Sequence, residues 1–111
     1  MSEDVNLDTE ISSGTQAKLL LESATFQGAV NRVQQAYFDE FASADPADAV
    51  KLQVIRLKLK ALADMVRDLR TVMETGQLAQ QQRDERIERE AREKALREGT
   101  AQAAQKVRGI F

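Results

Sequence analysis

The segment VKLQVIRLKLKALADMVRDLRTVM, residues 50–73, carries the clearest structural pattern in this chain. Large apolar side chains recur along it in alternating steps of three and four residues, which is the period of an α-helix and not that of a strand. The pattern predicts one helix that runs from Pro46 to about Glu74. Its main apolar stripe consists of Leu52, Ile55, Leu59, Leu62, Val66, Leu69 and Met73.

A second apolar stripe lies beside the first on the same predicted helix. At about 100° per residue, the two stripes together cover roughly 200° of the helix surface, about twice what an ordinary surface helix needs. One neighbouring helix can cover only one stripe, so the excess predicts a homo-oligomer. The sequence leaves open which stripe forms the core. We assign the subunit contact to Val50, Val54, Leu57, Ala61, Met65 and Val72.

The preceding segment predicts the other arm of an antiparallel helical hairpin. Ser23 is a good N-cap for a helix over residues 24–42. The link 43–48 is short, and its Asp45–Pro46 pair is typical of an N-cap followed by the first helical residue. So short a link between two long helices favours an antiparallel arrangement. The apolar stripe expected to face the partner helix is Phe26, Val30, Val33, Tyr37 and Phe41.

The two ends of the chain differ from this centre. Residues 1–14 are acidic, without a basic residue, and predict a flexible leader before a short helix over 15–22. Gly76 is expected to end the long helix as its C-cap or to form a hinge. A charged helix over residues 77–98 follows, and Gly99 is expected to end it. Within 83–98 there are twelve charged residues, six of each sign.

These boundaries divide the chain into four parts: leader 1–14, hairpin core and oligomerisation domain 15–76, charged helix 77–98, and C-terminal tail 99–111. The tail ends in an apolar group, Val107, Ile110 and Phe111, which is either a loose end or, in the interpretation that we favour, a docking segment for another protein. The fold class is therefore all-α, with a short N-terminal helix before the hairpin and a long charged helix after it.

The composition argues against an enzyme. The chain has neither cysteine nor histidine, which excludes thiol nucleophiles, imidazole bases, disulfides and the usual zinc sites. There is no glycine-rich phosphate loop, no nucleophile elbow and no carboxylate cluster with the spacing of metal ligands. We therefore expect no catalytic residues, no cofactor and no metal. The acidic first residues do not form a signal peptide, and no apolar run is long enough to span a membrane.

Nucleic acid is a second candidate partner. Arg56, Lys60, Arg67 and Arg70 fall within about 80° of one another on the predicted long helix. A ring of subunits could present this stripe many times to phosphates. Against it, the net charge is −2 and no helix-turn-helix pattern is evident. A solvated face of an amphipathic helix is the simpler interpretation, so nucleic acid contact is not favoured.

The sequence from Ala17 to Ala79 resembles small helical proteins encoded among the head and packaging genes of tailed bacteriophages. The resemblance lies in AKLLLESATFQGAV (17–30), FASADPAD (41–48) and VIRLKLKALADMVRDLRTVMETGQLA (54–79). It covers rather more than half of the chain and includes no catalytic motif. It implies a non-catalytic virion or assembly component, present in the host cytoplasm during assembly or in the virion, with other phage head or packaging proteins as partners.

Two alternatives remain beside this interpretation. The first is a ring adaptor similar to the small subunit of terminase, although no DNA-binding helix-turn-helix precedes the hairpin. The second is an intracellular regulator that binds a single partner protein through an exposed helix face. Contact with DNA or with the packaging motor distinguishes the first, and a monomer or dimer that becomes ordered only with its partner distinguishes the second.

Overall fold

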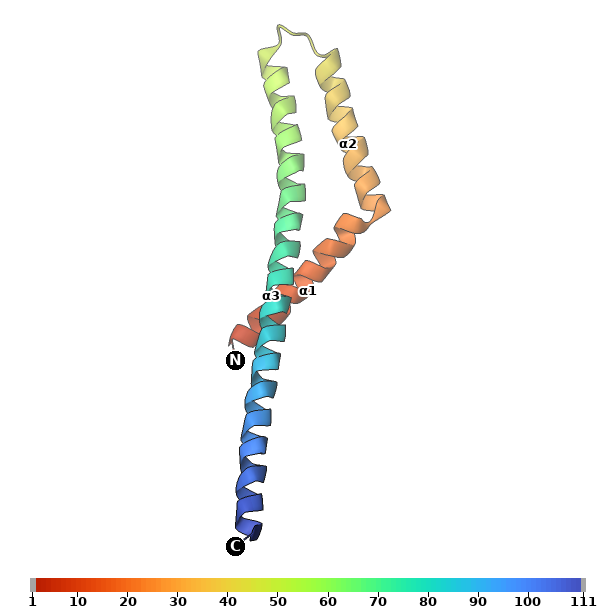
Figure 1. Cartoon of the computed structure of the whole chain (residues 1–111). Coiled ribbons are helices and arrows are strands. Elements are labelled where there is room, and N and C mark those ends of the chain that lie inside the picture. Colours follow the sequence, from red (N-terminus) through yellow and green to blue (C-terminus); the bar gives the residue numbers. More distant parts are fainter. Residues whose placement is uncertain (1, 111) are drawn as a thin grey trace.

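The computed structural model consists of three helices and describes the backbone of residues 2–110 and the side chains of residues 6–100. They are α1 (Ser2–Glu22), α2 (Ala24–Ser43) and α3 (Ala49–Ile110). No strand occurs in the described backbone, so the predicted all-α class is confirmed. α2 and the first part of α3 run in opposite directions from the loop that joins them, and α1 crosses α3 near its middle (Figure 1).

The molecule is a rod. Its extents are 97 × 25 × 18 Å and its radius of gyration is 26.4 Å, about twice the roughly 13 Å typical of a compact domain of this size. The length comes from α3, whose 62 residues span about 93 Å at 1.5 Å per residue. Such a shape leaves most of the surface in contact with solvent.

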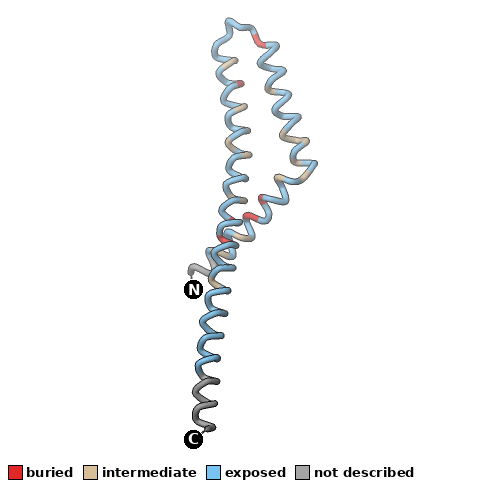
Figure 2. Tube along the Cα trace, in the orientation of Figure 1, coloured by how far each residue is buried: buried red, intermediate tan, exposed pale blue. Residues whose placement is uncertain are grey.

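Few residues of the described part are buried, and they lie in two places along the rod (Figure 2). Ala17 and Ala79 belong to the crossing of α1 and α3, whereas Ala44 and Ile55 lie near the loop between α2 and α3. Ile55 is the only large side chain among them, at 1% exposure. The closely packed hairpin core expected from the sequence is therefore not confirmed.

The start of α2 agrees with the sequence. Ser23 has an extended backbone and its hydroxyl accepts a hydrogen bond from the Phe26 amide, at 3.3 Å. This contact satisfies one of the amides that the first turn of a helix leaves without a partner. The prediction of Ser23 as N-cap is confirmed, and α2 ends at Ser43, one residue beyond the predicted end.

The start of α3 differs from the sequence prediction by three residues. Asp45 accepts a hydrogen bond from the Ala47 amide, at 2.9 Å, and so closes a turn around Pro46. Asp48 then accepts from the Lys51 amide, at 3.1 Å, and caps a helix that begins at Ala49. Two aspartates in this link can cap a helix, and the prediction chose the wrong one.

The predictions for the ends of the chain are wrong as regards helix boundaries. Residues 2–14 are helical and continuous with the expected short helix over 15–22, and α3 passes through both Gly76 and Gly99 without interruption. The leader lies against α3, where an ion pair joins Asp8 to Arg83 at 3.0 Å. Contacts made far away in the sequence therefore support a segment whose own composition predicts flexibility.

Gly76 does not end α3; it lies inside the helix, at the point where α1 crosses α3. A Cβ atom placed on Gly76 would lie 2.7 Å from the Gly14 Cα and 2.8 Å from the Glu10 carbonyl oxygen. A Cβ placed on Gly14 would lie 2.6 Å from the Gly76 Cα. The two helices thus meet backbone against backbone, and only glycine at both positions permits this approach.

Candidate interaction surfaces

The second apolar stripe of α3 is uncovered along most of its length. Val50 is 77% exposed, Leu57 56%, Val54 45% and Met65 44%, and Ala61 is also exposed. Val72 is half-buried, because α1 crosses α3 at this level and the Val72 carbonyl lies close to Gly14. Five of the six residues assigned to a subunit contact are therefore accessible to a partner, and the sixth belongs to the crossing.

The first stripe of α3 faces its own chain. Ile55 is buried, and Leu52, Leu59, Leu62, Val66, Leu69 and Met73 are half-buried. On α2, Phe26, Val30 and Tyr37 are half-buried, whereas Val33 and Phe41 stay about 40% exposed. In the isolated chain, the first stripe is thus turned to α2 and α1, and the second is exposed except at Val72.

An open groove lies between α2 and α3 because their side chains meet only in part. Its larger cavity, about 500 Å³, lies between the α1–α2 junction and α3, where Leu21 and Phe26 face Val66 and Met73. A second cavity of about 370 Å³ continues it along α3 and shares Val30, Val66 and Arg70 with the first. A third, about 270 Å³, lies near the loop, between Phe41 and Leu52.

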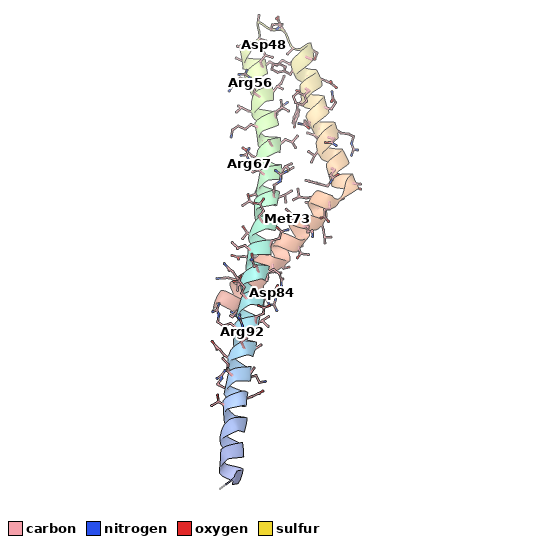
Figure 3. All side chains as sticks on the ribbon, viewed as in Figure 1. Asp48, Arg56, Arg67, Met73, Asp84 and Arg92 are labelled. Atoms are coloured by element: carbon pink, nitrogen blue, oxygen red, sulfur yellow. The ribbon has the colours of Figure 1, made fainter. Side chains whose placement is uncertain are left out.

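The two long sides of the groove differ. On one side, Lys58 joins α3 to α2 through an ion pair with Glu40 at 3.5 Å and lies 5.6 Å from the centre of the Tyr37 ring. On the helical wheel, Arg56 and Arg70 lie more than 100° away from Lys58, on the other side. There they border the cavities: Gln27, Asn31 and Gln34 of α2 line the two cavities that Arg70 borders, and Phe41 lines the third, which Arg56 borders. Figure 3 shows the side chains along the two helices.

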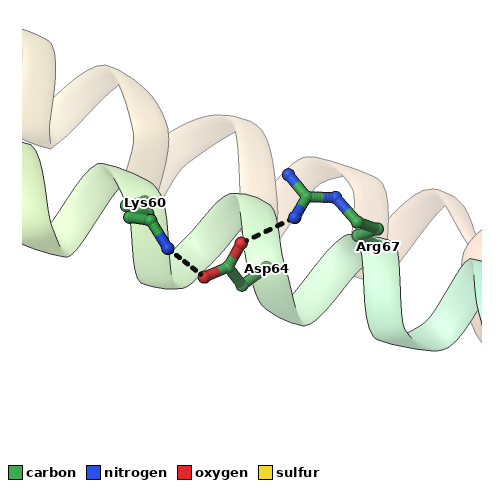
Figure 4. A network of polar contacts seen from close by, with 3 residues as sticks. All are labelled: Lys60, Asp64 and Arg67. Carbon is green, nitrogen blue, oxygen red and sulfur yellow. Dashed lines mark hydrogen bonds and ion pairs between the residues drawn. The ribbon is translucent and has the colours of Figure 1, made fainter.

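The basic stripe proposed for nucleic acid divides into two pairs. Lys60 and Arg67 both bind Asp64, through its two carboxylate oxygens, at 3.1 and 3.0 Å (Figure 4). Arg56 and Arg70 have no ion pair among the described side chains. The net charge of the Lys60–Asp64–Arg67 group is +1, so the stripe carries less charge than the sequence pattern indicated.

The remaining predictions about sites concern the ends of the chain and metal binding. The side chains of Val107 and Ile110, and all of Phe111, lie outside the described residues, so the docking tail stays a prediction. Among the described residues, no group of three or more acidic side chains could hold a metal ion. Within the same part of the chain, no helix combines the length and apolar character needed to cross a membrane.

Sequence reasoning missed both the crossing and the groove. A signal for the crossing exists, because Gly14–Ala17 and Gly76–Ala79 both have a glycine followed three residues later by alanine. Such spacing places small residues on one face of each helix and allows close approach of two helices. The groove has no local signal, since it depends on how far α2 stands from α3.

Comparison of the chain with models of protein families, with curated proteins and with solved structures finds no match. Arguments about function therefore depend on the surfaces just described.

Proposed function

We propose that this protein is a non-catalytic assembly component that works by self-association through the exposed stripe of α3. The observation that carries the proposal is the free row Val50, Val54, Leu57 and Met65 on the side of α3 that the chain itself leaves uncovered. Scattered apolar side chains are normal on protein surfaces, but a continuous row along one helix face is typical of a contact with another helix.

The limits of this stripe also support a helix-to-helix contact. Asp68 follows Met65 on the same face of α3 at about 100° per residue, and both Asp68 and Lys51 are exposed. Charged residues at the borders of an apolar row keep a contact in register, since a shifted partner would place a charge against apolar side chains. In this proposal, α2 and α3 form the hairpin that presents the stripe to the second copy.

The wider setting of the proposal comes from the resemblance to tailed-phage head and packaging proteins. In that setting the assembly acts in the host cytoplasm or in the virion, with other phage proteins as partners and the tail residues Val107, Ile110 and Phe111 as the docking segment. A ring adaptor similar to terminase small subunits is the variant of this proposal that includes DNA contact through Arg56 and Arg70, the two cations without an ion pair.

A regulator that binds one foreign protein is the second candidate, and the open shape favours it. A chain with so little buried apolar surface has a small core of its own. A partner that binds the folded form adds to its stability by mass action. Under this alternative, the purified protein is a monomer or a dimer, and its stability rises steeply when the correct partner is added.

The test is the native mass of the full chain by light scattering, at low and high salt. We expect an oligomer that is stable to salt, because the proposed contact is apolar. The double substitution Leu57→Glu/Met65→Glu should dissociate it while helicity persists. The matched control is Leu78→Glu/Leu96→Glu, which changes the charge equally at exposed positions outside the stripe. An oligomer that survives the first variant, or a monomeric parent protein, contradicts the proposal.

A further inference from the structure

The groove between α2 and α3 is a second surface, separate from the exposed stripe, that the chain itself leaves unfilled. Its two larger cavities are connected and extend along α3 from Leu59 to Met73, and a separate third cavity lies nearer the loop, at Leu52 and Arg56. The whole row spans about 30 Å of helix. Its apolar floor on α3 includes Leu59, Leu62 and Val66, which are only half-buried. A row of open cavities of this length between two helices, with half-buried apolar side chains along it, can accommodate a third helix of about 20 residues.

The side chains along the open side of the groove are positively charged or neutral, with one exception, so they favour a helix with negative charge. Arg56 borders the cavity near the loop, and Arg70 borders both larger cavities. Neither has an ion pair among the described side chains, and between them the Lys60–Asp64–Arg67 group carries a net +1. On α2, the facing residues Gln27, Asn31 and Gln34 are neutral. Glu22, at one end, is the one carboxylate that borders the two larger cavities.

The other side of the groove provides the contrast. There Lys58 has Glu40 as its partner and also lies over the Tyr37 ring, so its charge is already compensated within the chain. The imbalance is thus confined to the open side. A helix that enters from this side meets apolar side chains with one face and uncompensated guanidinium groups with one edge.

We infer that this groove binds an amphipathic helix of another protein whose apolar face fills the space over Leu59, Leu62 and Val66 and whose carboxylate edge pairs with Arg56 and Arg70. Guanidinium groups bind carboxylates with two parallel hydrogen bonds, which fixes the edge of the guest helix as well as its charge. The guest completes a three-helix core that α2 and α3 alone leave open. This inference concerns a surface separate from the self-association stripe, which lies elsewhere around α3.

The experiment uses the full chain and two labelled synthetic helices of about 20 residues, matched to the length of the groove. Both have leucine at helical spacing on one face; one has glutamate along the edge and the other lysine. By fluorescence anisotropy at physiological salt, we expect the glutamate helix to bind at least about tenfold more tightly. Equal affinity for the two helices overturns the inference.

Charge reversal tests the edge. Arg56→Glu/Arg70→Glu should weaken binding of the glutamate helix by about tenfold or more and reverse the preference in favour of the lysine helix. The control Arg92→Glu/Arg97→Glu changes the net charge equally at exposed positions on the charged part of α3. Equal losses in the two variants indicate attraction by net charge alone and overturn the inference. Circular dichroism checks that every variant is folded.

Further variants test the apolar floor of the groove and two other possible ligands, DNA and a second copy of this chain. Val66→Glu should abolish binding of the glutamate helix, whereas Leu57→Glu/Met65→Glu should leave it unchanged even if that variant alters the native mass. A labelled DNA duplex that binds through Arg56 and Arg70 and is unaffected by Val66→Glu overturns the inference in favour of nucleic acid. Loss of an oligomer in Arg56→Glu/Arg70→Glu overturns it in favour of a second copy of this chain.

Discussion

α3 meets α1 and α2 in opposite ways. At the crossing with α1, two glycines bring the backbones together, and Ala17 and Ala79 are buried beside them. Along α2, phenylalanines and branched side chains hold the helices apart and leave cavities between them. The region with the largest apolar side chains is thus the more loosely packed. Fit between surfaces, and not the amount of apolar material, decides where this chain packs closely.

We expect the largest loss of stability from a substitution at the crossing of α1 and α3. Gly76→Ala places a Cβ 2.7 Å from the Gly14 Cα and 2.8 Å from the Glu10 carbonyl oxygen, and backbone atoms cannot turn away as a side chain can. We expect a loss of about 1–3 kcal/mol in the free energy of unfolding. Urea denaturation followed by circular dichroism, at one fixed protein concentration, measures it.

The control for this prediction is Gly99→Ala. A Cβ at Gly99 meets nothing within 4 Å, and alanine favours a helix over glycine by up to about 1 kcal/mol. The same substitution should therefore destabilise at one glycine of α3 and leave stability unchanged or slightly raised at the other. If both variants gain stability, the backbone contact at the crossing is not what holds α1 to α3.

The next prediction compares the loss of stability at two positions in the loosely packed region between α2 and α3. Ile55 is 1% exposed, whereas Leu59 is half-buried at the edge of a cavity. Ile55→Ala should cost about 2 kcal/mol, and Leu59→Ala about 1 kcal/mol or less, because less contact is lost where the groove is open. The same denaturation measurement applies. Equal costs, or a larger cost at Leu59, mean that the groove is closed in solution.

The smallest effect concerns the ion pairs between helices. Asp8–Arg83 joins α1 to α3 at 3.0 Å, and Glu40–Lys58 joins α2 to α3 at 3.5 Å, and all four side chains are largely exposed. Asp8→Asn and Glu40→Gln should each change the free energy of unfolding by less than about 1 kcal/mol, and salt should reduce the difference. A salt-independent loss greater than this contradicts the view that packing, not charge, distinguishes the two regions.

Local rules predicted part of this fold correctly. The all-α class, the cap at Ser23 and the end of α2 near Ala42 depend on residues close in the sequence, and the structure shows all three. The helical state of residues 2–14 and the continuity of α3 through Gly76 depend on each other, across more than sixty residues. A glycine considered alone indicates a helix end; opposite a second glycine, it indicates a contact.

The candidate surfaces also divide into features that depend on neighbouring residues, which could be predicted, and features that depend on distant residues, which could not. The periodicity of residues 50–73 predicted two stripes, and five of the residues assigned to a contact are exposed. The groove could not be predicted, because its width depends on the direction in which α2 leaves Ser23. Ion pairing could not be predicted either: Asp64 compensates Lys60 and Arg67 but not Arg56 and Arg70, although all four cations share one face.

The position of the crossing has a mechanical consequence. From Gly76, α3 extends about 40 Å to its first residue and about 50 Å to Ile110. The pair Gly14–Gly76 has no side chains to interlock, so it can act as a pivot with two long lever arms. A change of about 10° in the crossing angle moves the far end of α3 relative to α1 by roughly 9 Å, given the rise per residue of a helix. A small change in the angle between α1 and α3 therefore becomes a large displacement at the C-terminal end of α3.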